Sequence, residues 1–94
     1  MIVIYKFPLS ITDHQFLKVP GVTLQPLTVQ MQNGIPMLWL MLETGEPYSY
    51  PVHCFGTGHE ISFDVYRFQN YVGTIQLKDG TVWHFFTPKV QGVI

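Results

Sequence analysis

The segment 56–59, Gly-Thr-Gly-His, has the composition of a loop that could hold a small ligand. Its members are Gly56, Thr57, Gly58 and His59. Glycines let a backbone approach a ligand closely and turn several N–H groups toward an anion. The threonine adds a hydroxyl group, and the histidine ring can stack or donate a hydrogen bond. The segment lacks the Gly-Lys-Ser/Thr ending of a phosphate-binding loop, so an ordinary tight turn is the alternative interpretation.

Arg67 is the only arginine of the chain, and aromatic residues flank it. A guanidinium group can bind a phosphate through two parallel hydrogen bonds, and neighbouring rings can stack on a nucleobase. The alternative is that the stem of Arg67 covers an apolar edge of the fold. Tyr66 and Trp39 are the rings that we expect to stack on a base, although most aromatic residues of a small β domain belong to a core or an interface.

The remaining titratable residues form no catalytic or metal-binding motif. The four histidines are spaced too irregularly for a zinc site, in which two ligands commonly lie close together on one element. His53 and Cys54 are adjacent, so in a strand their side chains point to opposite faces and do not form a base–nucleophile pair. We therefore expect no catalytic residue, no metal and no cofactor. A small hydrolase that depends on His59 or His84 is the less favoured alternative.

The composition excludes several classes of protein. The 94 residues fit one domain, residues 1–94. With 12% charged and 47% hydrophobic residues, the chain does not resemble a disordered tail. A net charge of −1 argues against a general nucleic-acid binder, which needs Lys and Arg to neutralise phosphates. The longest apolar run, residues 37–42, is much shorter than the roughly 20 residues of a membrane-spanning helix, so we expect no membrane partner.

Cysteine usage and the first residues predict a cytoplasmic protein. One cysteine excludes an internal disulfide, and a lone thiol suits a reducing compartment. The first residues are apolar and the first charge is Lys6, which is the reverse of the basic-then-apolar order of a signal peptide.

These residues must be positioned by strands, because the chain offers few segments suited to a helix. It contains 8 glycines, 7 prolines and no alanine. The pattern predicts an all-β domain, an antiparallel sheet of about five to seven strands built from hairpins, arranged as a small, partly closed barrel or a sandwich.

Two glycine-containing turns predict the hairpins. Asn33-Gly34 tolerates the positive φ angles of a type I′ turn and lies between the strand-like segments 27–32 and 35–42. Asp79-Gly80 has the same turn chemistry and lies between 71–78 and 81–87. Further strands are expected at residues 1–7, 15–19, 52–55 and 61–66, and a turn-rich connection at 44–51.

The chain has more apolar side chains than a core of this size usually holds. Residues 37–42 are apolar at every position, which indicates a strand covered on both faces. Together with residues 82–86, this surplus predicts a homo-oligomer, a dimer or a multiple of one.

Several ordered segments carry a family resemblance. They are residues 6–9 (Lys-Phe-Pro-Leu), 12–13 (Thr-Asp), 29–34 (Val-Gln-Met-Gln-Asn-Gly), Pro36, 38–39 (Leu-Trp), 56–59 and 71–74 (Tyr-Val-Gly-Thr). With these segments the chain resembles a family of short proteins encoded by tailed phages and prophages. The resemblance implies a setting, the cytoplasm of an infected bacterium, rather than an activity. The chain departs from the family over residues 61–70, so the resemblance does not extend to Arg67.

Phage genes of this size often encode counter-defence proteins, and one class sequesters cyclic nucleotide or cyclic ADP-ribose immune signals without cleaving them. The chain is similar to those small oligomers in size, low charge and apolar surplus. We expect the loop 56–59 to contact phosphate or ribose, Arg67 to pair with phosphate, and Trp39 or Tyr66 to stack on a base. The alternative is an interaction module that caps a phage protein or a host defence protein through its apolar or edge strands.

Overall fold

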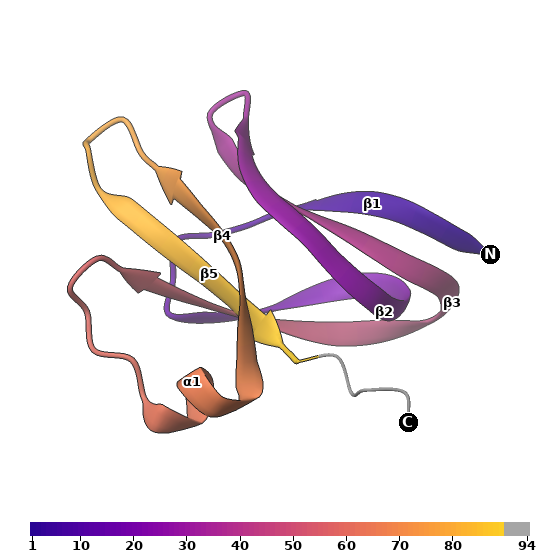
Figure 1. Cartoon of the computed structure of the whole chain (residues 1–94). Coiled ribbons are helices and arrows are strands. Elements are labelled where there is room, and N and C mark those ends of the chain that lie inside the picture. The colour runs from indigo at the N-terminus through magenta and orange to yellow at the C-terminus, as the bar shows by residue number, and fades with distance from the viewer. Residues whose placement is uncertain (90–94) are drawn as a thin grey trace.

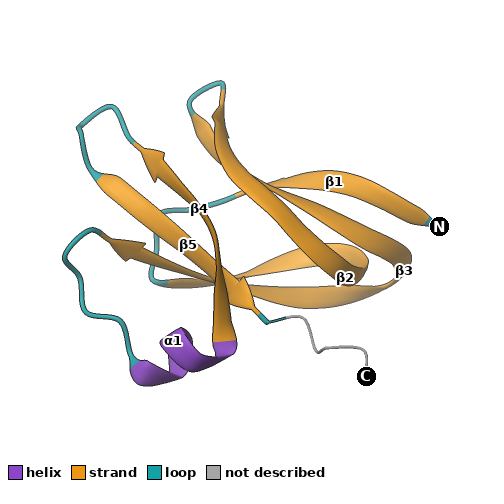
Figure 2. Ribbon diagram, in the orientation of Figure 1, coloured by secondary structure: helices purple, strands orange, loops and turns teal. Residues whose placement is uncertain are grey.

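The computed structural model describes residues 1–89, which form five antiparallel strands in one open sheet and one short helix (Figures 1 and 2). The predicted antiparallel β fold is confirmed. The elements are β1 (Ile2–Pro8), β2 (His14–Gln32), β3 (Ile35–Gly56), α1 (Phe63–Phe68), β4 (Gln69–Gln76) and β5 (Val82–Pro88).

β3 is the central strand and pairs with three others. Its first half lies between β1 and the second half of β2, where Trp39 is opposite Lys6 on one side and Thr28 on the other. Its second half lies between the first half of β2 and β5, and His53 is opposite His14 there. β4 pairs with the far edge of β5. The long strands β2 and β3 therefore belong to both halves of the sheet, and the sheet bends between the two halves.

β2 continues through Pro20-Gly21, although the sequence predicts that a strand stops there. The partner on β3 changes from Tyr48 at Val19 to Thr44 at Gly21, so residues 45–47 of β3 lie opposite Pro20 and form the bulge. Gly21 has φ +151°, and a Cβ there would lie 1.9 Å from the carbonyl oxygen of Glu43. A larger residue would separate the strands. The predicted connection at 44–51 is likewise wrong, because β3 continues through it.

The two hairpin turns differ in type. Asn33 and Gly34 both have positive φ angles, +52° and +79°, as a type I′ turn requires. In the second turn the Leu77 N–H donates to the Thr81 carbonyl at 2.9 Å. Gly80 is the residue of this turn that has a positive φ angle, +87°. This loop is longer than the two-residue turn that the sequence predicts.

Residues 63–68 form the helix α1, so the strand predicted at 61–66 is wrong. The Ser62 hydroxyl accepts a hydrogen bond from the Val65 N–H at 3.3 Å and caps the first turn. Asp64 lies in the first turn and Arg67 in the last, the arrangement that the helix dipole favours. None of the helix residues is fully buried. Local capping therefore outweighed the strand-like alternation of apolar residues.

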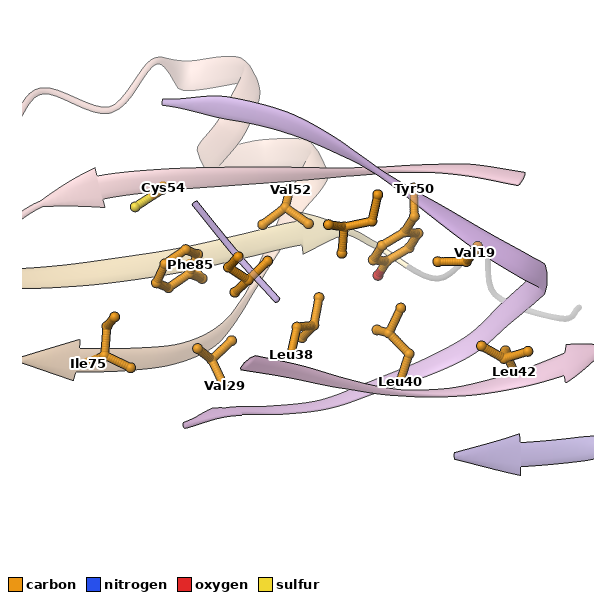
Figure 3. Packing of buried hydrophobic residues seen from close by; sticks show 12 residues of the cluster. Val19, Val29, Leu38, Leu40, Leu42, Tyr50, Val52, Cys54, Ile75 and Phe85 are labelled. Atoms are coloured by element: carbon orange, nitrogen blue, oxygen red, sulfur yellow. The ribbon is translucent and has the colours of Figure 1, made fainter. Parts of the chain in front are cut away.

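The core lies on one face of the bent sheet (Figure 3). Leu38, Leu40 and Leu42 of β3 are fully buried, whereas Met37, Trp39 and Met41 on the opposite face are half-buried. Within the described chain the second face of residues 37–42 is therefore only partly covered, and its complete cover by a second copy stays a prediction. The buried cluster is completed by Leu9, Leu17, Val19, Val29, Tyr50, Val52, Cys54, Ile75 and Phe85.

β4 packs against β2 at Gly73. A Cβ at this position would lie 2.9 Å from the Val29 Cβ and 3.0 Å from the Val29 backbone nitrogen. Glycine is therefore needed for the close approach that brings the two ends of the sheet together over the core.

Candidate functional site

The loop 56–59 is a tight turn held against β5. Thr57 N–H donates to the Val82 carbonyl at 3.2 Å, and His59 N–H donates to the Gly56 carbonyl at 3.0 Å. Gly58 has φ +86°, which a glycine adopts without strain. The loop therefore starts where β3 ends and is fixed by backbone hydrogen bonds at both sides.

The His59 ring folds back over Gly56. The Gly56 N–H donates to His59 Nδ1 at 3.3 Å, which makes Nε2 the protonated nitrogen of the neutral ring. The ring also meets Trp83 edge to face, with centroids 5.7 Å apart. A Cβ on Gly56 would lie 2.8 Å from His59 Cε1, so this ring position depends on the glycine.

The loop does not turn several N–H groups outward, as an anion-binding loop would. The N–H groups of Gly56, Thr57 and His59 are all used within the protein. Within the described chain, the Gly58 N–H is the one of the four without such a bond. Contact with a ligand through the loop would therefore involve this N–H and side chains.

A chain of hydrogen bonds connects the loop to β4 through His84. Thr57 Oγ1 lies 2.8 Å from His84 Nε2, and His84 Nδ1 lies 3.0 Å from Thr74 Oγ1. The Tyr71 hydroxyl lies 2.6 Å from the same threonine oxygen. Both nitrogens of the His84 ring are engaged, so this histidine positions the loop and is not free to bind a ligand.

An aromatic surface covers the sheet face opposite the core beside this loop. The rings of His14 and His53 stack with centroids 4.5 Å apart, and His53 is parallel to Phe55 at 6.4 Å. Phe55 meets Phe86 edge to face at 5.9 Å. His53 and Phe55 alternate along β3 with the buried Cys54, which explains why they share this face.

The loop and the aromatic surface border a pocket of about 400 Å³. Imidazole and phenyl rings provide its flat walls, and two carboxylates and a hydroxyl provide polar groups. It is lined by Asp13, His14, His53, Phe55, His59, Glu60, Ser62 and Val65. We call this the histidine pocket.

His53 is held toward its neutral form. Burial lowers its pKa, the neighbouring His14 lowers it further, and the Gln69 side chain acts in the opposite direction. Its Nδ1 is buried and has no hydrogen-bond partner among the described residues. In the histidine pocket, His53 therefore contributes an uncharged flat ring at neutral pH.

Cys54 does not face the histidine pocket. It is fully buried in the core, and burial together with the Asp13 charge raises its pKa to about 11. Strand alternation separates it from His53, as the sequence predicts. Among residues 1–89, no group of three or more His, Cys, Asp and Glu side chains is placed to hold a metal ion.

The structure separates some of the predicted site residues. His59 lines the histidine pocket and belongs to the same loop as Gly56, Thr57 and Gly58. Tyr66 and Arg67 lie exposed on α1 and do not line the pocket, and the Arg67 guanidinium is 5.4 Å from the Phe68 ring centre.

Trp39 lies in the half of β3 that pairs with β1, whereas the loop follows the other half, so the two do not form one site. Of the eight residues that line the histidine pocket, one, His59, was predicted from the sequence as a site residue. The alternation of His53 and Phe55 next to the loop was an available indication. Nothing local indicates His14, because its place beside His53 depends on the pairing of β2 with β3.

A second cavity, of about 650 Å³, has mainly apolar walls. Its lining includes Phe16, Tyr48 and Pro51 and ends at Lys89, the last described residue. It contains no histidine or carboxylate in its described lining. The histidine pocket offers more hydrogen-bonding groups and is therefore the better candidate for a polar ligand.

Comparison with known proteins gives a family without an assigned activity. One family model, described as a domain of unknown function (DUF7352), matches residues 1–93. No curated protein and no solved structure matches the chain. None of the helices in residues 1–89 is long and apolar enough to span a membrane.

Proposed function

We propose that this chain, which belongs to the DUF7352 family, binds a small nucleotide-derived ligand in the histidine pocket and holds it without cleaving it. The observation that carries the proposal is the juxtaposition of flat rings and carboxylates around one pocket of about 400 Å³. A pocket of this size can enclose a base and its ribose.

The rings of the pocket suit a planar base. His14, His53 and Phe55 all line the pocket, where His14 and His53 stack on each other and Phe55 lies parallel to His53. Stacking of a base on such rings contributes about 1–3 kcal/mol per base. Burial keeps His53 neutral, so its ring adds no positive charge to the stacking surface. A base therefore needs no charge of its own to stack there.

The carboxylates of the pocket suit hydroxyl and amino groups. Asp13 and Glu60 accept hydrogen bonds only, so they match the hydroxyls of a ribose or the exocyclic amine of a base. They repel phosphate, and no Lys or Arg is among the lining residues. The phosphate groups of a ligand would therefore lie outside the pocket. Arg67 is two positions after the lining residue Val65 on α1, about 200° around the helix, so it would meet a phosphate group that extends past the helix.

Sequestration agrees with the chemistry of the described groups. His84 is engaged at both nitrogens, His59 at Nδ1, and Cys54 is buried with a raised pKa. The resemblance to phage proteins supports the cytoplasm of an infected bacterium as the place of action. Removal of a nucleotide immune signal there would counter the host's defence.

A thermal-shift screen against cyclic dinucleotides, cyclic trinucleotides and cyclic ADP-ribose isomers tests the proposal, with chromatography of the recovered ligand. We expect a shift of several degrees and an unchanged ligand. Phe55→Leu should weaken binding about tenfold, because it removes a stacking ring. Tyr5→Leu is the control, because Tyr5 is an exposed ring on β1 and does not line the histidine pocket.

Arg67→Ala separates the two parts of the site. It should weaken binding of phosphorylated ligands and leave the corresponding nucleosides unaffected, and Lys78→Ala should change neither. No shift with any ligand would contradict the proposal. An altered ligand would replace sequestration by hydrolysis.

The exposed rings of α1 favour one second function, that of an interaction module for a host or phage protein. Phe63, Tyr66 and Phe68 are 67%, 74% and 57% exposed, an unusual density of apolar surface on a helix of six residues. A protein partner bound through this helix would leave the melting temperature unchanged by nucleotides and would be lost in Tyr66→Ser.

A further inference from the structure

Among residues 1–89, β1 is bonded along one edge only and lies at the end of the sheet order. At its two ends Thr44 N–H donates to the Met1 carbonyl at 2.9 Å, and Leu9 N–H donates to the Pro36 carbonyl at 2.9 Å. In an antiparallel ladder, alternate residues direct both backbone groups to the same neighbour. The odd-numbered residues of β1 therefore bond to β3, and the even-numbered ones direct their N–H and C=O groups away from it.

The free edge thus consists of the backbone groups of Ile2, Ile4 and Lys6, followed by Pro8, which has no N–H. The side chains of Ile2 and Ile4 are 59% and 56% exposed. Proteins usually protect a strand edge with charges, prolines, bulges or a covering element, and on this edge Lys6 and Pro8 protect its second half while Ile2 and Ile4 are left exposed. β4, at the other end of the sheet order, is covered because it packs against β2 at Gly73.

We propose that β1 pairs with β1 of a second copy of this chain, antiparallel about a two-fold axis, with Ile4 opposite the partner's Ile4. Ile2 then lies opposite the partner's Lys6, and Lys6 opposite the partner's Ile2. Each of these pairs joins residues whose backbone groups face outward, so each exchanges two hydrogen bonds, about six in total. The inference is independent of ligand binding in the histidine pocket.

Backbone chemistry selects this register. A two-fold axis at Tyr5 would place Ile2 opposite the partner's Pro8, which cannot donate a hydrogen bond. The axis at Ile4 uses every outward N–H group of the strand and leaves proline outside the ladder.

The side chains on the outer face agree with the same register. Met41 is the neighbour of Ile4 on β3, so the central row contains Met41, Ile4 and the same two residues of the partner. Trp39 is the neighbour of Lys6, and Glu43 is the neighbour of Ile2. In the dimer each Lys6 lies directly opposite the partner's Ile2, and the partner's Glu43 follows one strand further in the same row. Within the chain, Lys6 Nζ donates to Gln32 Oε1, and Glu43 pairs with the Met1 ammonium group at 2.6 Å.

Cysteine cross-linking tests the register on the full chain. In Ile4→Cys the two new residues form a hydrogen-bonded pair with Cα atoms about 5.5 Å apart, within the range of a disulfide. We expect oxidation to produce a covalent dimer of twice 10.8 kDa. Ile2→Cys is the matched control, because its two copies would be about 13 Å apart along the strand. An excess of alkylating agent is present during denaturation, so that the buried Cys54 is blocked as it becomes exposed and does not form a disulfide.

Ile4→Pro tests the hydrogen bonds. The Ile4 N–H does not bond to β3, so proline removes an intermolecular donor and spares the ladder within the chain. We expect sedimentation to show a dimer for the unchanged protein and a dissociation constant raised about tenfold or more for the variant, with a retained β circular dichroism spectrum. A monomeric unchanged protein would overturn the inference. Equal cross-linking of Ile2→Cys and Ile4→Cys, or a dimer that Ile4→Pro leaves intact, would do the same.

Discussion

Thr57 Oγ1 lies 2.8 Å from His84 Nε2, and this contact joins the loop 56–59 to the sheet. The other ring nitrogen, Nδ1, lies 3.0 Å from Thr74 Oγ1. A neutral imidazole has one donor and one acceptor, and a hydroxyl can serve as either, so both contacts are satisfied without a charge. The loop that borders the histidine pocket is therefore held by a side chain of β5 as well as by its own backbone.

Replacing Thr57 should loosen this attachment. Thr57→Val keeps the shape of the side chain and removes the hydrogen bond, so we expect the free energy of unfolding to fall by about 0.5–1 kcal/mol. Thr57→Ser retains the hydroxyl and should restore most of the loss. Urea denaturation followed by tryptophan fluorescence measures both. Equal stability of the valine variant and the unchanged protein would mean that the hydrogen bond does not hold the loop.

Gly56→Ala should displace the His59 ring, because the new Cβ would lie 2.8 Å from His59 Cε1. We expect a loss of about 1–3 kcal/mol in the free energy of unfolding and weaker ligand binding. Gly45→Ala is the matched control, since nothing lies within 4 Å of its Cβ position, and it should change stability by less than about 0.5 kcal/mol. Similar losses in both variants would show that His59 is not confined by Gly56.

Stability should fall with acidification because the pKa of His53 is lowered in the folded protein. The unfolded chain, with an ordinary histidine pKa near 6.5, then binds more protons than the folded one. The stabilising contribution is complete above about pH 6.5 and is lost as the pH falls toward the folded pKa. Thermal melts between pH 7.5 and 5 should show the decline, and His53→Gln should flatten it. NMR titration of His53 gives the pKa directly, and an ordinary value would refute this prediction.

Cys54 should be unreactive in the folded protein. Its pKa is raised to about 11, so about one molecule in a thousand carries the thiolate at pH 8, and the side chain is fully buried. We expect alkylation by iodoacetamide to be slower by about a hundredfold or more than in urea. Mass spectrometry after timed quenching measures the ratio. Rapid alkylation without denaturant would show that Cys54 is accessible.

Local residue chemistry determined much of the fold. The strand preference, the type I′ turn at Asn33-Gly34 and the glycine-rich loop that follows β3 were all predicted, because turn geometry and side-chain alternation depend on neighbouring residues. The opposite orientations of His53 and Cys54 followed from the same alternation.

Three local predictions failed where other interactions decided the conformation. Pro20-Gly21 normally ends a strand, but pairing with β3 carries β2 through it, and residues 45–47 of β3 form a bulge opposite Pro20. The Ser62 cap turns an alternating segment into α1. At Pro20-Gly21 the hydrogen bonds to the distant strand β3 decided the conformation. At Ser62 a local capping hydrogen bond outweighed the alternation of apolar and polar residues. The predicted connection at 44–51 failed for the first reason.

The candidate site itself was decided by tertiary structure. The sequence determined that the ring of His59 would lie beside the glycines of the loop 56–59, since His59 is the last residue of that loop. It did not determine that His14 would stack on His53, or that Trp39 would lie in another part of the sheet. Those relations depend on the register between strands distant in sequence, and register is set by the packing of the core face rather than by the residues of the site.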